Sequence, residues 1–334
     1  MSAYHRAAAG RAWWRTLVEL LLVAVLWFIA SVVLITIAIA TAQVKKLDEL
    51  DNTSSLFVAL STMALFLPAT LLAARITGRK AGMLSSVVGR LRWRWLLRCL
   101  GFALVANVVW VGAFVVLTAI LGDHEAAHEG TKAVATSTGD DGNLVQFLVL
   151  VFLLVPVQAA GEEYLFRGTL IQAVGRFIGT WPAAAIVSTV GFTAAHGALS
   201  TASVEIIAMG LVLSWLTVRT GGLEAAIGNH VVNNLLVFSM RALSHGGESI
   251  DSKHLNDGAT WGAIIGQTIG LAVYATLVVR SWKKQPATLS STQSAPAVAD
   301  QIEQHAAERR VSVEHADHGG DAEALAPEQQ EPRG

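Results

Sequence analysis

The chain has 334 residues, of which 53% are hydrophobic and 15% are charged, and its mean hydropathy is +0.51. So few charges on so apolar a chain exclude an ordinary soluble domain and indicate a multi-pass membrane protein. The formal net charge is −1, and no nucleic-acid partner is expected. Cys99 is the single cysteine, so an intrachain disulfide is excluded.

Apolar runs close to the length of a bilayer-spanning helix, about 20 residues, recur along the chain. The first is too long for the core of a signal peptide and is expected to be a retained anchor. Together they predict an all-α, multi-pass transmembrane helical bundle with about eight membrane helices. The predicted spans cover residues 17–42, 56–74, 96–122, 144–164, 181–199, 203–218, 223–243 and 259–280.

Three regions are expected along the chain. Residues 1–143 hold about three N-terminal membrane helices with their loops, and residues 144–284 form a membrane core that carries the polar motifs. Residues 285–334 are rich in Ala, Gln, Glu, His and Pro, and this composition predicts a disordered cytoplasmic tail.

The basic residues predict the orientation in the membrane. Arginine and lysine gather in the N-terminal segment, in the loop after the second predicted span and after the last span, whereas the other loops are richer in acids. The positive-inside rule then places both termini in the cytoplasm, in agreement with an even number of spans. We expect a multi-pass protein of the plasma membrane, surrounded by the lipid bilayer.

Two adjacent glutamates, Glu162 and Glu163, lie in an apolar run, and Arg167 follows one helical turn later. A single carboxylate in a membrane span costs on the order of 3 kcal/mol, so an adjacent pair needs a reason. Of the ten histidines, His196 and His230 also lie inside apolar runs. Acids, an arginine and histidines at membrane depth together predict a reaction centre.

Three pairs in this part of the chain share a spacing of four residues. They are Glu163 with Arg167, Phe192 with His196, and His230 with Asn234. Residues four apart lie on one face of a helix, so each pair is expected to face the interior of the bundle. The carboxylate of Glu163 would be neutralised by Arg167, which leaves Glu162 free to accept a proton as a general base.

Each of these residues also has a purely structural interpretation. The Glu163–Arg167 pair can simply lock two helices together, and a lone histidine or asparagine in a membrane helix commonly bonds to a neighbouring helix. Three further glutamates have ordinary explanations. Glu205 and Glu224 lie near span ends and are expected to be hydrated, whereas Glu19 lies one turn inside the first span and is expected to reach toward the interface. The combination of three motifs is what favours a catalytic site.

The three motifs, in this order on successive apolar helices, resemble those of the CAAX protease and bacteriocin-processing (CPBP/Abi) family. Its members are intramembrane endopeptidases related to type II CAAX prenyl endopeptidases. The similarity covers about residues 144–240 and includes the flanking glycines Gly161 and Gly168. It implies that residues 144–284 form a CPBP/Abi-like catalytic membrane core.

The resemblance also implies roles for individual residues. Glu162 corresponds to the glutamate that activates water, and Glu163 with Arg167 corresponds to its supporting pair. His196 corresponds to the histidine of the second motif. His230 and Asn234 correspond to groups that contribute to the site and to oxyanion stabilisation.

Two versions of the chemistry are open at this point. Glu162, His196 and His230 could bind zinc with an open position for water. Alternatively, without a metal, Glu162 and His196 activate the water while His230 and Asn234 stabilise the oxyanion. No cofactor is certain, and the metal-free version is preferred because asparagine is an uncommon zinc ligand.

The predicted function is therefore hydrolysis of a peptide bond in a membrane-associated or lipid-modified protein or peptide, by a glutamate-activated water. One alternative is a catalytically silent membrane protein on the same scaffold, such as an immunity or assembly factor. Another is a proton-coupled transporter, whose relay would also use buried Glu and His. Transporters commonly have paired half-repeats, which this sequence lacks.

Overall fold

The computed structural model describes residues 4–42, 52–121, 141–197, 202–245 and 257–285, which belong to one compact unit. All named elements in these residues are helices, as predicted. The long ones are α1 (Trp13–Ala42), α5 (Trp93–Leu121), α7 (Asp141–Glu163), α10 (Ala202–Thr220), α11 (Glu224–His245) and α12 (Asp257–Trp282). The shorter ones are η1 (Tyr4–Arg6), α2 (Asn52–Ala64), α3 (Phe66–Ile76), α4 (Gly82–Ser85), η3 (Tyr164–Leu170), α8 (Ile171–Ile178) and α9 (Trp181–Ala195). The predicted tail, except residue 285, lies outside the described residues.

The protein is an integral membrane protein. Among the described residues, six helical segments are long and apolar enough to cross a membrane. They are Trp13–Ala42, Ser54–Ile76, Trp93–Ile120, Leu144–Ile178, Ser203–Thr220 and Trp261–Trp282. The other two predicted spans also form helices, but α9 has only 15 residues and α11 is less apolar because it carries histidine and several asparagines.

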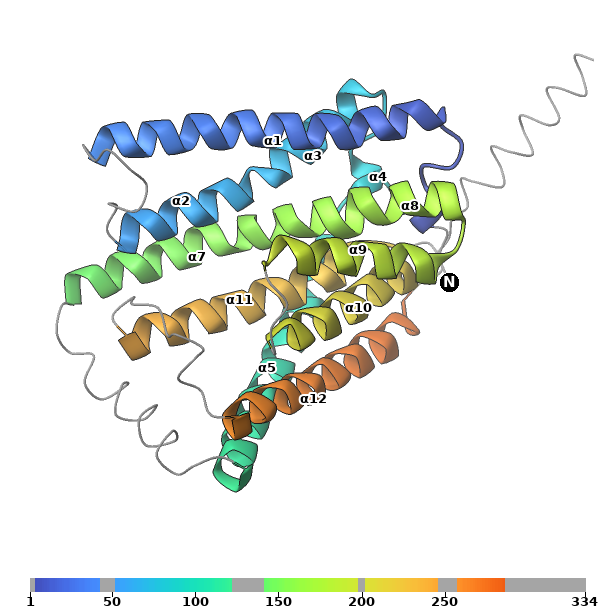
Figure 1. Cartoon of the computed structure of the whole chain (residues 1–334). Coiled ribbons are helices and arrows are strands. Elements are labelled where there is room, and N and C mark those ends of the chain that lie inside the picture. The colour runs from blue at the N-terminus through green and yellow to red at the C-terminus, as the bar shows by residue number, and fades with distance from the viewer. Residues whose placement is uncertain (1–3, 43–51, 122–140, 198–201, 246–256, 286–334) are drawn as a thin grey trace, which may run out of the picture. The chain divides into compact units, whose positions relative to one another are not determined.

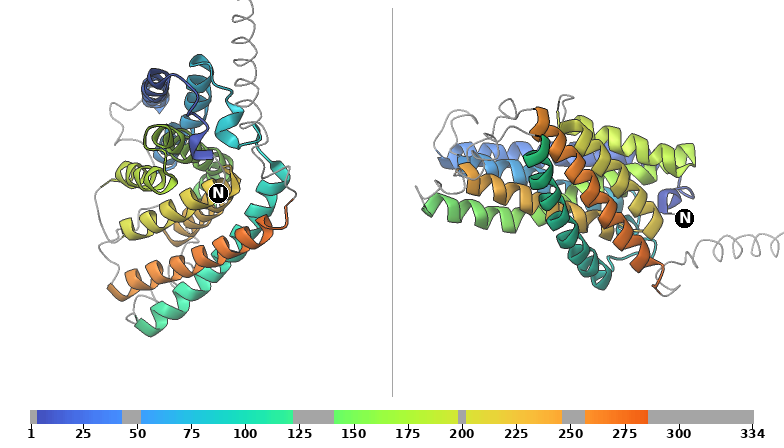
Figure 2. Two further views of the ribbon diagram at one scale, coloured as in Figure 1. Left: turned by 90° about the vertical axis from the view of Figure 1, so that its right-hand side faces the viewer. Right: turned by 90° about the horizontal axis from the view of Figure 1, so that it is seen from below.

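The helices fall into two sets that meet at α10 and α11. Figure 1 shows α1, α2, α7 and α11 with their axes roughly parallel, and α9 and α10 beside them. Helices α5 and α12 pack along each other, and both views of Figure 2 keep them side by side. Since α11 contacts both α7 and α5, it presents one face to the helix with the two glutamates and another face to the α5–α12 pair.

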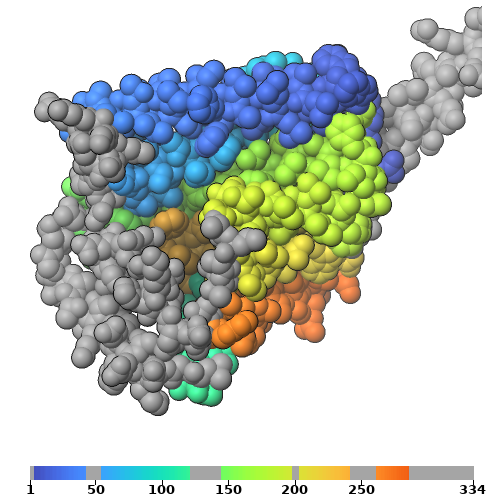
Figure 3. All heavy atoms as spheres, in the orientation of Figure 1, coloured from blue at the N-terminus to red at the C-terminus, as the bar shows by residue number. Residues whose placement is uncertain are grey.

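Helix α1 lies at the edge of the bundle. Only 11% of its apolar window is buried, and Figure 3 shows its side chains open to the surroundings along the visible face. Long apolar side chains exposed in this way are expected to contact lipid, because a transmembrane helix needs no other cover for its apolar surface.

Glu19, near the start of α1, is only 1% exposed. Its carboxylate lies 2.5 Å from Arg11 Nη1 and 2.6 Å from Arg79 Nη1. The expectation that Glu19 reaches toward the interface was wrong, because Arg11, eight residues earlier, and Arg79, 60 residues later, enclose its carboxylate. These ion pairs tie the start of α1 to the residues that follow α3.

Glu224, the first residue of α11, is fully buried, so the expectation of a hydrated side chain was also wrong. Its Oε1 accepts hydrogen bonds from the Arg92 backbone N at 2.8 Å and from Nε at 2.9 Å, and its Oε2 accepts one from Nη2 at 2.6 Å. A carboxylate at a helix N-terminus is also favoured by the helix dipole. The pair fixes the start of α11, and therefore the position of His230 less than two turns later.

Candidate active site

Glu162 and Glu163 are the last two residues of α7, and the seven-residue π-helix η3 follows them directly. π-helical turns are rare and occur frequently at functional sites. Glu162 is 5% exposed and Glu163 is fully buried. The close packing of α7 against α2 depends on Gly161, because a Cβ at this position would lie 3.0 Å from the Met63 carbonyl oxygen.

The carboxylate of Glu163 is the centre of the site. Its Oε1 accepts a hydrogen bond from Arg167 Nη1 at 3.0 Å and lies 2.7 Å from His230 Nδ1. The predicted pairing of Glu163 with Arg167 is therefore present, on the first turn of η3. The contact with His230, 67 residues away, joins α7 to α11.

His230 lies between the two glutamates. Because a carboxylate oxygen can only accept, His230 Nδ1 carries the proton of the hydrogen bond to Glu163. The other ring nitrogen, Nε2, faces Glu162 and lies 3.6 Å from its Oε2. The Arg167 guanidinium offsets part of the negative charge that the two glutamates bring into this buried cluster.

Gln158 lies one turn before Glu162 on α7. It belongs to this site but was not among the residues predicted from the sequence motifs. Its Nε2 donates to Glu162 Oε1 at 2.6 Å, and its Oε1 accepts a hydrogen bond from Asn234 Nδ2 at 3.2 Å. The other carboxylate oxygen, Glu162 Oε2, has no hydrogen-bond partner among the described residues. Gln158 thus holds one oxygen of Glu162 and leaves the other available.

The second motif lies at the end of α9. The helix ends at Ala195, four residues earlier than predicted, and Gly197 has a φ of +101°. His196 is therefore an exposed residue at the helix end rather than a buried one within it. Its Nδ1 donates to the Phe192 carbonyl at 2.8 Å, and its Nε2 has no hydrogen bond to the described part of the chain.

The ring of Phe192 connects the two histidines. Its centroid lies 4.4 Å from that of His196 and 5.8 Å from that of His230, and the Arg167 guanidinium lies over it at 4.1 Å. His196 is thus linked to Arg167 and His230 through Phe192, while the other predicted site residues are joined by direct contacts or through Gln158. Their catalytic roles remain predictions.

The zinc hypothesis can be compared with these positions. Within the described part of the chain, no three side chains of His, Cys, Asp or Glu are grouped so that they could hold a metal ion. Two of the predicted ligand atoms, Glu162 Oε2 and His230 Nε2, lie 3.6 Å apart, but a protein zinc site needs at least three ligands. Zinc therefore stays a prediction that requires a direct test.

Comparison with known proteins agrees with the family resemblance predicted from the motifs. Residues 144–236, which include all three motifs, match the family model of the type II CAAX prenyl endopeptidase Rce1-like proteins. The family resemblance is confirmed. The uncharacterized protein YyaK of Bacillus subtilis (strain 168) is 31% identical over 101 residues, which are 28% of this chain. The match spans about a third of the length of that relative (33%). No solved structure matches the chain with significance.

Proposed function

We propose that this protein is an intramembrane endopeptidase that hydrolyses a peptide bond in a membrane-associated or lipid-modified protein or peptide. The observation that carries the proposal is the buried Glu162 carboxylate, with Oε1 held by Gln158 and Oε2 beside His230 Nε2. A carboxylate fixed by one oxygen and available at the other suits a general base. The family match over residues 144–236 supports the reaction class.

We expect the following reaction at this site. Glu162 Oε2 accepts a proton from a water molecule, and the water oxygen bonds to the carbonyl carbon of the substrate's peptide bond. His196 Nε2 acts as a second hydrogen-bond acceptor for the same water. The oxyanion that forms is stabilised by the second N–H of the Asn234 amide and by His230, which can donate from Nε2 only when its ring is protonated, because Nδ1 already donates to Glu163. As the C–N bond breaks, the proton held by Glu162 passes to the leaving nitrogen, and the carboxylate is restored.

The substrate can be identified by comparative membrane proteomics of cells that express the wild type or Glu162→Ala. We expect at least one membrane-associated protein or peptide to accumulate uncleaved in the variant. If the two proteomes contain the same cleaved termini, the endopeptidase proposal is wrong, and a catalytically silent immunity or assembly factor becomes the better interpretation.

The proposed location is the plasma membrane with both termini in the cytoplasm, because the basic loops lie on one side. Reporter fusions at Arg90 and Ser290 should both report the cytoplasm, and a fusion at Gly130 should report the opposite side. A fusion at Arg90 that reports the outer side would contradict this topology.

We expect hydrolysis without a bound metal, since Glu162 and His230 already have supporting protein contacts that suit acid–base chemistry. The purified enzyme should contain well under one zinc per chain and should keep its activity in the presence of a chelator. Stoichiometric zinc that is lost in His196→Ala, with activity abolished by chelators and restored by zinc, would establish the metal version and leave the hydrolase proposal intact.

A further inference from the structure

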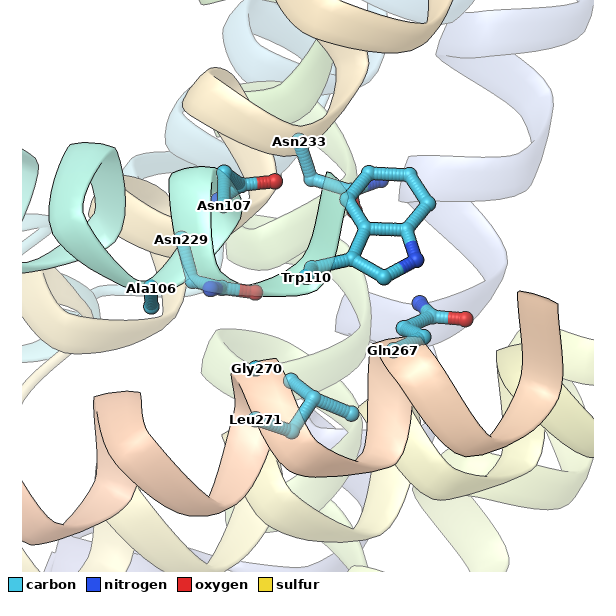
Figure 4. Close-up of a pocket in the computed structure, with 8 residues that line it drawn as sticks. All are labelled: Ala106, Asn107, Trp110, Asn229, Asn233, Gln267, Gly270 and Leu271. Carbon is cyan, nitrogen blue, oxygen red and sulfur yellow. The ribbon is translucent and has the colours of Figure 1, made fainter. Parts of the chain in front are cut away.

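A second polar site lies on another face of α11, away from α7. It is a pocket between α5, α11 and α12, and its polar lining consists of Asn107, Trp110, Asn229, Asn233 and Gln267. Figure 4 shows these side chains reaching toward the pocket from the three helices. The lining carries no charged side chain, so it offers no site for an ion but many hydrogen-bonding groups.

Three polar atoms around this pocket lack a partner. Trp110 Nε1, Asn229 Oδ1 and Gln267 Oε1 are buried and make no hydrogen bond within the described residues. The side chains of Asn229 and Gln267 belong to residues only 4% and 8% exposed. Buried polar groups are nearly always paired, and the hydrocarbon of a bilayer provides no substitute partner.

The three atoms match the hydrogen-bonding capacity of a water molecule. The indole N–H is a donor and the two amide oxygens are acceptors, whereas water accepts from one group and donates to two others. The space open to the centre of a water molecule is about 10 Å³, close to the roughly 10–15 Å³ that one water requires. A peptide segment or a lipid headgroup is too large for this space.

A line of amides leads from this pocket to Glu162. Asn233, which lines the pocket, donates to Asn234 Oδ1 at 3.3 Å. Asn234 donates to Gln158 at 3.2 Å, and Gln158 donates to Glu162 at 2.6 Å. Asn234 and Gln158 each accept at the amide oxygen and donate at the amide nitrogen, so hydrogen-bonded amides link the pocket to Glu162 Oε1.

We propose that the pocket is a water-binding site and that its water supplies Glu162 for hydrolysis. This inference rests on the proposed function, because each peptide bond that is hydrolysed consumes one water. Water is scarce at membrane depth, so a bound molecule beside the site shortens the time needed to replace it. Trp110, Asn229 and Gln267 hold the water, and Asn233 and Asn234 lie on its route.

Binding of the water can be tested without any substrate. The N–H vibration of the Trp110 indole is isolated by subtracting the vibrational spectrum of Trp110→Phe from that of the wild type, both in detergent. We expect a hydrogen-bonded indole in the wild type and in Gln267→Leu, where the water still bonds to Asn229, and loss of that bond in the Asn229→Leu/Gln267→Leu double variant. Loss in Gln267→Leu alone would show a direct bond from Trp110 to a rotated amide and would overturn the water site.

Supply is tested by the kinetics of the same variants on the identified substrate. The double variant and Asn233→Leu should each lower kcat by roughly tenfold at unchanged KM, less than the 10²-fold or more expected on loss of the base itself. Asn233→Leu should keep the Trp110 signal. Thr118→Val, which removes another buried hydroxyl at the α5–α12 contact, is the matched control and should keep kcat.

The outcomes separate the two proposals. Wild-type kcat in the double variant would overturn the supply role even if the enzyme hydrolyses peptides as proposed. Absence of proteolysis in the wild type would defeat the proposed function and the supply role together, whereas the Trp110 spectra would still decide whether the pocket binds water.

Discussion

Glu162→Gln is expected to lower turnover by at least about 10²-fold, the lower range for loss of a general base, while the fold is kept. The glutamine oxygen can still accept the hydrogen bond from Gln158 that Glu162 Oε1 accepts in the wild type. A neutral amide cannot take the proton of the attacking water, so only the chemical step should be lost. Purified protein in detergent, assayed on the substrate found by proteomics, gives the measurement.

The matched control for this change is Glu205→Gln. Glu205 lies in the first turn of α10, inside another apolar segment, and belongs to none of the motifs. The Glu205→Gln variant should keep near-wild-type turnover if the loss of turnover in Glu162→Gln reflects chemistry rather than removal of a carboxylate from an apolar segment. Near-normal proteolysis by Glu162→Gln would defeat the assignment of the base. A protein that acts by binding alone would keep its function in both variants.

The sequence predicted individual contacts well where the relevant signal is local. The spacing of four residues between Glu163 and Arg167 correctly indicated an ion pair on one helix face, and their contact is 3.0 Å. The third motif was also placed correctly, because His230 and Asn234 both reach α7. Such periodic spacing carries over to the fold because a helix places residues four apart side by side.

Other contacts between residues distant in sequence could not be predicted. Arg92 and Glu224 are 132 residues apart, and no local pattern indicates which arginine encloses which buried glutamate. Gln158 was overlooked because one glutamine in an apolar helix is ordinary, although its position four residues before Glu162 was an available signal. The early end of α9 at Ala195 was missed because the apolar run continues past it.

The π-helix also has no clear signal in the sequence. It depends on packing around Tyr164–Leu170, where Thr169 Oγ1 donates to the Tyr164 carbonyl at 3.2 Å. The consequence is functional, since η3 begins directly after the two glutamates and carries Arg167. The orientation of the guanidinium relative to Glu163 is therefore a product of the folded structure rather than of spacing alone.

Arg167→Ala should give the largest loss of stability among single substitutions in the site. Arg167 is fully buried, donates to Glu163, and lies over the ring of Phe192 at 4.1 Å. Removal of the guanidinium leaves the Glu163 carboxylate buried with only His230 beside it. Breaking one side of a buried ion pair costs about 3–5 kcal/mol, so both the folded yield and the melting temperature in detergent should fall, together with activity.

Two comparisons separate loss of the ion pair from loss of packing. Arg176→Ala removes an arginine of α8 that bonds only to the backbone carbonyls of Ala8 and Ala9 among the described contacts, and it should cost much less stability. The double variant Glu163→Gln/Arg167→Met removes both charges while the new glutamine oxygen can still accept from His230, so it should recover most of the stability lost in Arg167→Ala. A wild-type melting temperature for Arg167→Ala, or a double variant no more stable than the single one, would show that the buried ion pair does not hold this site together.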